Sequence, residues 1–243
     1  MSIQNIEARM LLNKYYPIIS WADNHGIPYS KIPRDIDKLS KLTKLDLSSL
    51  ELSYFPCCIC NLTNLKELDI SCNNLTELPN SIGSLTNLDK LDISFNQLTS
   101  LPDSISNLVN LTDLDISHNN LNKITNYISC LTNLNRLIIY NNKLTTLPDE
   151  IGKLTNLIKL DISFNQLTNL PNSISSLINL TKLDISHNDI NKPLDCIDFS
   201  DKIIIHENKL KILQEIEKEK SYNVYIKWHE NTLKKISELE YYI

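Results

Sequence analysis

The sequence is short of glycine, with 3 Gly among its 243 residues. A phosphate-binding loop needs several glycines that let the backbone approach the ligand closely, so loops of this kind are excluded. Glycine is also one of the residues that most often make tight turns. Other side chains must therefore build the turns of this chain.

Excess positive charge and long apolar runs are lacking too. Lys and Arg number 24 against 29 Asp and Glu, which gives a formal net charge of −5. This balance offers no electrostatic reason to bind nucleic acid or anionic lipid. No apolar run approaches the roughly 20 residues that span a bilayer, and no basic segment followed by an apolar run indicates a secretory signal. We expect no nucleic-acid partner, no membrane partner and a cytoplasmic location.

The cysteines do not form the spaced pairs of a disulfide framework. Three of the six lie within four residues and the other three are scattered: Cys57, Cys58, Cys60, Cys72, Cys130 and Cys196. Secreted, disulfide-stabilised domains show spaced pairs instead, so the pattern favours a reducing compartment. No second cysteine pair or histidine pair stands at zinc spacing. We therefore expect neither a metal nor a cofactor.

A 23-residue repeat dominates the chain. Leucines open similar segments at regular intervals, at Leu42, Leu65, Leu88, Leu111, Leu134, Leu157 and Leu180. The general form is LxxLxLxxNxLxxLPxxIxxLxN. One coil of this length cannot bury its own leucines, but a stack of coils makes a continuous core, and neighbouring coils supply parallel strands about 4.8 Å apart. The repeat predicts a right-handed α/β solenoid with about eight parallel strands on its concave face.

This pattern resembles the leucine-rich repeat family, in the 23-residue subclass with a Leu-Pro-x-x-Ile second half found in intracellular Ras-group and scaffold proteins. The resemblance covers about residues 32–210 and implies a horseshoe-shaped solenoid that binds proteins. The composition is rich in Asn, Ile and Lys and poor in Gly. It is similar to that of members from amoebal giant viruses and some protists, so we expect a viral or protist origin.

Asparagine recurs at the ninth position of the repeats. The series is Asn73, Asn96, Asn119, Asn142, Asn165, Asn188 and Asn208, while repeat one carries Leu50 instead. An amide at this position must point inward, where an unpaired polar group costs about 1–3 kcal/mol. We expect the side chains to form a structural ladder by hydrogen-bonding the backbone of their own and the adjacent coil. This ladder would replace glycine as the turn-maker.

The ends of the array differ from its middle. We expect an N-terminal helical cap over residues 1–31, in which Pro17 opens a second helix and Gly26 ends it. A last partial repeat over about 200–210 supplies an eighth strand with Ile204 at position five. A C-terminal cap follows over 211–243, with a helical partner-binding tail as the alternative. The side opposite the strands should hold short helical or 3₁₀ turns, whose type the sequence leaves open.

The outward residues of the strands give the candidate binding face. Position five supplies a column of carboxylates that includes Asp92, Asp115 and Asp161. One interpretation is a charged recognition face. The alternative is that these residues are the family's common choice on a solvated sheet and have no binding role. A metal along this column is not expected, because ligands on a sheet diverge whereas a cation needs them to converge.

Repeat five breaks the pattern with an outward row of Arg136, Ile138 and Tyr140. Arg and Tyr are enriched at the centres of protein interfaces, so this row is the predicted hot spot. Aromatic residues at position eight of nearby coils extend it as a ridge: Phe95, His118, Phe164 and His187. The alternative is that these rings only cover the edge where the strands turn.

Catalytic motifs are missing from the sequence. No Gly-x-Ser-x-Gly or His-Glu-x-x-His motif occurs. Cys196 and Asp198 match the Cys-x-Asp of bacterial leucine-rich-repeat ubiquitin ligases, but no separate catalytic domain follows them.

We therefore expect a non-enzymatic protein-interaction module that binds a protein partner on its concave face, as a monomer or weak dimer. A rigid, preformed surface of this kind loses little entropy on binding. One alternative is an adaptor that recruits a signalling enzyme or a ubiquitin ligase through its terminal segments. The other is a structural protein with no specific ligand.

Overall fold

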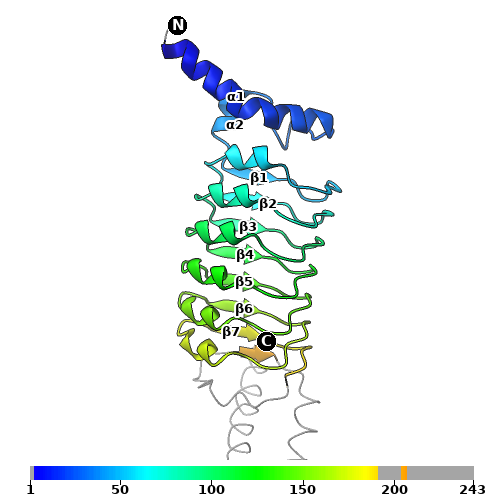
Figure 1. The fold of residues 1–243 in the computed structure, drawn as a ribbon, viewed down its shortest axis with the longest axis vertical. Helices are drawn as coiled ribbons and strands as arrows, with labels where there is room; N and C mark the ends of the chain where they lie inside the picture. Colours follow the sequence, from blue (N-terminus) through cyan, green and yellow to red (C-terminus); the bar gives the residue numbers. More distant parts are fainter. Residues whose placement is uncertain (1–2, 191–203, 207–243) are drawn as a thin grey trace, which may run out of the picture. The chain divides into compact units, whose positions relative to one another are not determined.

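Each repeat places a three-residue strand at the same point of its coil. The computed structural model describes residues 3–190 and 204–206, all of which belong to one compact unit, Met1–Glu207. Eight parallel strands form one sheet in chain order and follow one another along the stack of coils (Figure 1). They are β1 (Lys44–Asp46), β2 (Glu67–Asp69), β3 (Lys90–Asp92), β4 (Asp113–Asp115), β5 (Arg136–Ile138), β6 (Lys159–Asp161), β7 (Lys182–Asp184) and β8 (Ile204–His206). The predicted stack of parallel strands is confirmed.

The strands pair in register with the repeat. Leu68 stands opposite Leu91 and Leu91 opposite Leu114, so each strand from β1 to β7 directs its central leucine into one shared core. The register changes at the last pair, where Ile204 pairs with Lys182 of β7. Lys182 stands at position three of its repeat, so the prediction that Ile204 stands at position five is wrong. Asn208 and the C-terminal segment 211–243 lie outside the described residues.

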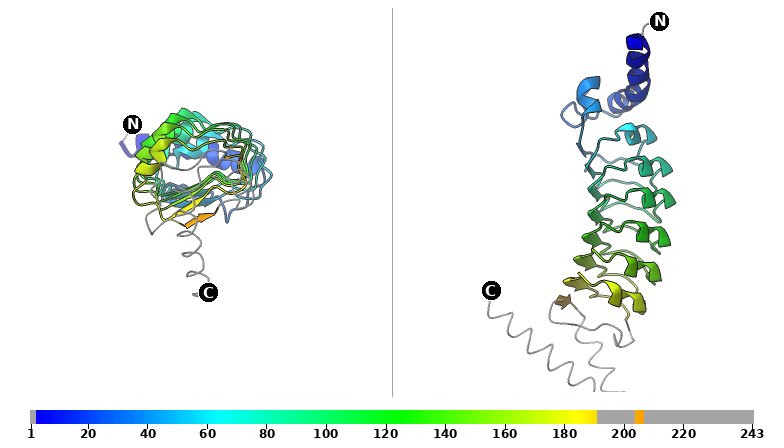
Figure 2. Two further views of the ribbon diagram at one scale, coloured as in Figure 1. Left: turned by 90° about the horizontal axis from the view of Figure 1, so that it is seen from below. Right: turned by 90° about the vertical axis from the view of Figure 1, so that its left-hand side faces the viewer.

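The wall across the core from the sheet consists of 3₁₀ helices (Figure 2). These are η1 (Cys57–Asn61), η2 (Asn80–Ser84), η3 (Asp103–Asn107), η4 (Asn126–Cys130), η5 (Asp149–Lys153) and η6 (Asn172–Ser176). All but η4 follow a proline, whose fixed φ sets an extended entry. In η2 the carbonyl of Pro79 accepts the N–H of Ile82 at 3.0 Å, and Ile82 is fully buried.

The predicted asparagine ladder lies inside the coils. Oδ1 of Asn119 accepts the N–H of Leu98 in the preceding coil at 2.9 Å. Its Nδ2 donates to the carbonyl of Ile93 in that coil at 3.0 Å and to Ile116 of its own coil at 3.2 Å. The same pattern recurs from Asn73 to Asn188. Each amide therefore joins two coils.

The residue before each ladder asparagine makes the turn without glycine. Its φ is positive at Cys72, Phe95, His118, Asn141, Phe164 and His187, with values between 51° and 55°. This left-handed conformation costs a non-glycine residue about 1–2 kcal/mol. The hydrogen bonds of the adjacent asparagine hold the backbone there.

A second amide ladder runs along an exposed edge of the coils. Its members are Asn64, Asn87, Asn110, Asn133, Asn156 and Asn179. In each, Nδ2 donates to a carbonyl of the preceding coil, and for Asn110 this is Thr86 at 2.8 Å. This ladder was not predicted from the sequence, although the asparagine that ends the repeat formula marks its position.

The N-terminal cap is one continuous helix, α1 (Ile3–Asn24), followed by the short α2 (Ile36–Ser40). The prediction of a second helix beginning at Pro17 is wrong. A proline inside a helix removes one hydrogen bond and kinks the helix, and α1 bends along its length without breaking (Figures 1 and 2). Ile18 and Ala22 beyond the proline are fully buried, which holds this part of α1 on the core.

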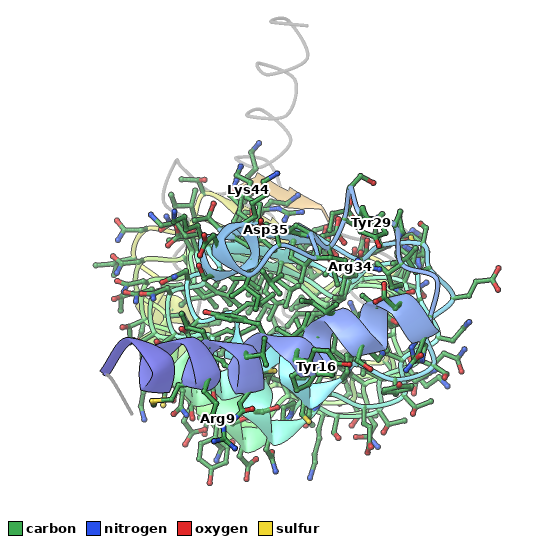
Figure 3. The ribbon with its side chains drawn as sticks, turned by 90° about the horizontal axis from the view of Figure 1, so that it is seen from above. Arg9, Tyr16, Tyr29, Arg34, Asp35 and Lys44 are labelled. Atoms are coloured by element: carbon green, nitrogen blue, oxygen red, sulfur yellow. The ribbon has the colours of Figure 1, made fainter. Side chains whose placement is uncertain are left out.

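Gly26 ends α1 as predicted. Its φ is +63°, and its N–H donates to the carbonyl of Asp23 at 3.2 Å. The N–H of Ile27 donates to Ala22 at 2.8 Å, which completes a Schellman motif. Arg34 connects the segment after α1 to the end of that helix, because its Nε donates to Asp23 at 2.7 Å. Its guanidinium also lies 4.5 Å from the ring centroid of Tyr29 (Figure 3).

The other two glycines lie where neighbouring coils approach most closely. A Cβ added at Gly83 would stand 2.5 Å from the carbonyl oxygen of Ser104, and one at Gly152 would collide with the carbonyl of Ser173. Any side chain at either position would force two coils apart.

Replacing Asn119 with Ala is expected to lower the free energy of unfolding by about 1–3 kcal/mol, because Leu98 and Ile93 lose their buried partners. Urea unfolding measures the change. Asn110→Ala is the matched control, since its ladder lies in solvent and its loss should cost clearly less. Equal losses in the two variants would contradict the assignment of the inner ladder as the buried one.

Gly83→Ala is expected to destabilise the protein by about 1–3 kcal/mol, the usual cost of overpacking. If the coils left room for a Cβ, alanine would raise the stability, because it restricts the unfolded chain. The sign of the change in stability therefore shows whether the coils are in contact at this position. A thermal melt of the variant with an unchanged or raised midpoint would show that the coils are not in contact here.

Candidate functional site

The outward surface of the sheet, here called the sheet face, carries carboxylates that are partly used by the fold itself. Oδ1 of Asp92 accepts the backbone N–H of Ser94 at 2.9 Å and its hydroxyl at 2.6 Å. The same pair of bonds recurs at Asp46, Asp69, Asp115, Asp161 and Asp184. One oxygen of each carboxylate thus fixes the end of a strand, and the other is left for further contacts.

A hollow of about 750 Å³ opens on the sheet face over β1 to β5, beside the segment 29–38. Its charged lining residues are Lys31, Lys38, Lys44, Lys90, Arg136, Asp46, Glu67, Asp69, Asp92, Asp113 and Asp115. Lys31 pairs with Asp46 at 3.0 Å, and Lys44 pairs with Glu67 at 2.9 Å. Charged groups of both signs are therefore interspersed along the lining of the hollow.

Arg136 closes one end of this hollow. Its Nη1 lies 2.6 Å from Oδ1 of Asp113, and its Nη2 lies 3.1 Å from Oδ2 of Asp115. The guanidinium therefore bridges two carboxylates of β4. This pairing fixes the orientation of the side chain and neutralises part of the acidic column.

Asp92 and Asp46 stand at the same repeat position in different surroundings. Burial raises the pKa of Asp92, and the neighbouring carboxylates of Asp115 and Asp69 add to the shift against the hydrogen bonds from Ser94. The hydrogen bond from the Ser48 hydroxyl lowers the pKa of Asp46, and Lys31 acts in the same direction. Carboxylates at the same repeat position therefore differ in pKa along the sheet face.

Five rings form a row along one edge of the sheet face. Phe95 stacks on His118 with 3.8 Å between ring centroids, and Phe164 stacks on His187 at 3.9 Å. Tyr140 stands between the two pairs, 4.7 Å from His118 and 5.2 Å from Phe164. We call these five residues the aromatic row.

Tyr140 fills a gap in the row. Repeat five carries Asn141 at position eight, where four other coils place a ring, and Tyr140 supplies the missing ring from position seven. Nδ2 of Asn141 lies 2.7 Å from Nδ1 of His118. Burial lowers the pKa of His118, although Asp115 opposes this shift, so the imidazole is neutral at neutral pH.

The row leaves apolar surface exposed. Phe95 is 51% exposed and Phe164 is 43% exposed, so the stacked rings do not hide one another completely. The expected Arg-Ile-Tyr row differs at its middle member, because Ile138 is only 5% exposed. Neighbouring side chains cover it, and the prediction of Ile138 as an exposed anchor is wrong.

The cysteine cluster lies elsewhere, on η1. Burial raises the pKa of Cys58 and raises that of Cys60 to about 11, so both thiols stay protonated. Within residues 9–190, no group of three or more His, Cys, Asp or Glu side chains could hold a metal ion. None of the helices described combines the length and apolar character that crossing a bilayer needs.

Comparison with known proteins places the chain among repeat proteins. The family model described as Leucine rich repeat matches residues 61–121 and 132–190. An internalin, InlF, from Listeria monocytogenes is similar in structure, with 26% identity over 71% of this chain and 49% of its own, and a TM-score of 0.61. No curated protein sequence matches.

Two solved complexes are also similar. The structure of PEPR1-AtPEP1 shares 30% identity over 68% of this chain and 24% of its own, with a TM-score of 0.60. The plant peptide hormone receptor RGFR1 in complex with RGF2 shares 36% identity over 65% and 26%, with a TM-score of 0.58. The present chain thus spans about half the length of the internalin and about a quarter of the matched chain in each of the two complexes.

Asp92→Asn and Asp46→Asn are expected to change stability in opposite directions at neutral pH. The raised pKa of Asp92 means that the folded state loses stability as pH rises through that pKa, so the variant should be more stable than the parent at neutral pH. The lowered pKa of Asp46 means that its ionised form stabilises the fold, so Asn should destabilise it.

Urea unfolding at neutral pH and at successively lower pH tests this pair, because both differences should shrink as the carboxyls become protonated, that of Asp46 at the lower pH. Each asparagine keeps an oxygen that can accept from the serine. Changes of the same sign in both variants would contradict the electrostatic description of the column.

Proposed function

We propose that this chain, which matches the leucine-rich repeat family over residues 61–121 and 132–190, binds another protein through the sheet face without catalysing a reaction. Members of the family generally mediate protein–protein interaction. The observation that carries the proposal is the aromatic row, which exposes apolar rings along the edge of an otherwise charged face.

The rigidity of the sheet face supports this function. Its side chains stand on strands paired in register, and the carboxylates and Arg136 are held by hydrogen bonds. A surface that is ordered before binding loses little conformational entropy on association. The hollow over β1 to β5 adds charged groups of both signs that can fix the orientation of a partner.

A second candidate function is recruitment through the N-terminal helix. The part of α1 before Pro17 exposes four large apolar side chains, Met10, Leu11, Leu12 and Tyr16. Exposed apolar clusters of this kind mark interaction sites when they are contiguous. An adaptor that recruits a signalling enzyme or a ubiquitin ligase would use this helix rather than the sheet face.

We also propose a reducing, cytoplasmic location. All five described cysteines are unpaired, and Cys57, Cys72 and Cys130 are exposed. Exposed free thiols are compatible with the cytosol and are oxidised in secreted proteins.

Tyr140→Ala is expected to weaken partner binding at least fivefold, because an interface hot spot is worth more than about 1 kcal/mol. The measurement is affinity capture of the partner from the native host, followed by titration with the purified partner. Loss of the edge-on ring contacts should cost stability by only about 1 kcal/mol, so the variant stays folded.

Tyr127→Ala is the matched control, since Tyr127 is 47% exposed on η4, across the core from the sheet. A Leu12→Ser variant tests the helix. Capture that survives Tyr140→Ala but is lost in Leu12→Ser would reject the sheet face in favour of the adaptor.

A further inference from the structure

The orientation of the rings makes Tyr140 unlike the other members of the aromatic row. Phe95 and His118 are nearly parallel, at 14°, and Phe164 and His187 meet at 25°. Each ring of these pairs therefore covers a face of its neighbour. Tyr140 meets His118 at 78° and Phe164 at 82°, so both contacts are edge-to-face and no ring of the row lies parallel to a face of Tyr140.

A free aromatic face attracts cations. The face of a tyrosine ring carries the negative end of its quadrupole, and Lys and Arg groups bind within about 6 Å of it. The guanidinium of Arg136, which comes from the same strand, is held by Asp113 and Asp115. In the part of the chain that the structure describes, no Lys or Arg group lies over the Tyr140 ring, so we expect a cation at this face to come from a partner.

Carboxylates stand beside the row on the coils that follow Tyr140. Asp161 and Asp184 each commit one oxygen to a serine, Ser163 and Ser186. Among the described residues, neither carboxylate belongs to an ion pair. The remaining oxygen of each can accept from a basic group of a ligand, although Lys159 and Lys182 stand two residues away on the same strands.

The length of the row suits an extended chain. Its four centroid steps are 3.8, 4.7, 5.2 and 3.9 Å, and an extended polypeptide advances about 3.3 Å per residue. The row therefore matches about five residues. Alternate side chains of such a segment point to the same side, so two or three of its cations can reach the carboxylates together.

We propose that the aromatic row, with Asp161 and Asp184, is a docking strip for an extended polypeptide segment with Arg or Lys at alternate positions. This inference rests on the proposed function and names the chemistry of its partner. One cation lies on the face of Tyr140, and the next lies against Asp161. The backbone of the segment lies along the edges of Phe164 and His187.

Titration of the full chain with three fluorescein-labelled decapeptides tests this proposal by fluorescence anisotropy. Their sequences alternate Thr with Arg, with Gln or with Glu. The Arg peptide should bind at least tenfold more tightly than the Gln peptide, and its affinity should fall as NaCl increases. The Glu peptide should bind most weakly.

Variants locate the binding on the row. Tyr140→Leu keeps the apolar bulk but loses the aromatic face, and it should weaken Arg-peptide binding about three- to tenfold. Phe164→Asn should weaken it too, while the turn is kept, because Asn141 already adopts the same φ of 52° in the neighbouring coil. Tyr127→Leu should leave the affinity unchanged.

Two variants that remove the same charge distinguish binding at the docking strip from attraction by the overall negative charge of the protein. Asp161→Asn and Asp149→Asn remove the same charge, but Asp149 lies exposed on η5, across the core. Only Asp161→Asn should weaken binding. Equal effects of the two variants, wild-type affinity in Tyr140→Leu, equal binding of the Arg and Gln peptides, or no binding at all would each overturn the proposal.

Competition between the Arg peptide and the captured partner distinguishes failure of this inference from failure of the proposed function. Displacement of the captured partner by the Arg peptide supports both. Capture that depends on Tyr140 but resists the Arg peptide would overturn only the basic segment. Capture that does not depend on Tyr140 would overturn the sheet face as the binding surface.

Discussion

The structure depends on one buried contact, the amide of a ladder asparagine that bonds two coils at once. Asn119 shows why this contact is needed: it satisfies an N–H and a carbonyl of the preceding coil together with carbonyls of its own. Without it those buried backbone groups would lack partners, and the left-handed turn at His118 would lose its support. A chain with almost no glycine can therefore repeat a tight turn in coil after coil.

The same turn sets the geometry of the candidate site. The ladder asparagine fixes the backbone of the residue before it, and in four coils that residue carries a ring. Rings on successive coils then stand at stacking distance, as Phe95 and His118 do. The aromatic row is thus a consequence of the fold as well as a candidate contact surface, and the departure at Tyr140 and Asn141 places one ring edge-to-face between two stacked pairs.

The sequence predicted those features that repeat in register. Strand positions, the shared core and the inward asparagines all follow from one period, because a residue type recurring at a fixed place in a coil must meet the same surroundings each time. The outer amide ladder was equally periodic, but Asn110 and its equivalents looked like polar loop residues until their bonds to the preceding coil were visible.

Features that depend on neighbours outside the period were not predictable. Ile138 points away from the core, but surrounding side chains cover it. Pro17 normally marks a helix start, but packing beyond it kept α1 continuous. The carboxylates looked like free surface charges, whereas one oxygen of each is bound by serine. Tertiary contacts decided the first two cases, and a hydrogen bond between residues two apart decided the third.

Amide hydrogen exchange tests the central contact most directly. The N–H groups of Leu75, Leu98, Leu121 and Leu144 are each bonded to a ladder asparagine. They should exchange only through large-scale unfolding, with protection close to that of the central strands. Exchange of these four groups at the rate of an unstructured peptide, while the strands stay protected, would show that the amides do not join the coils.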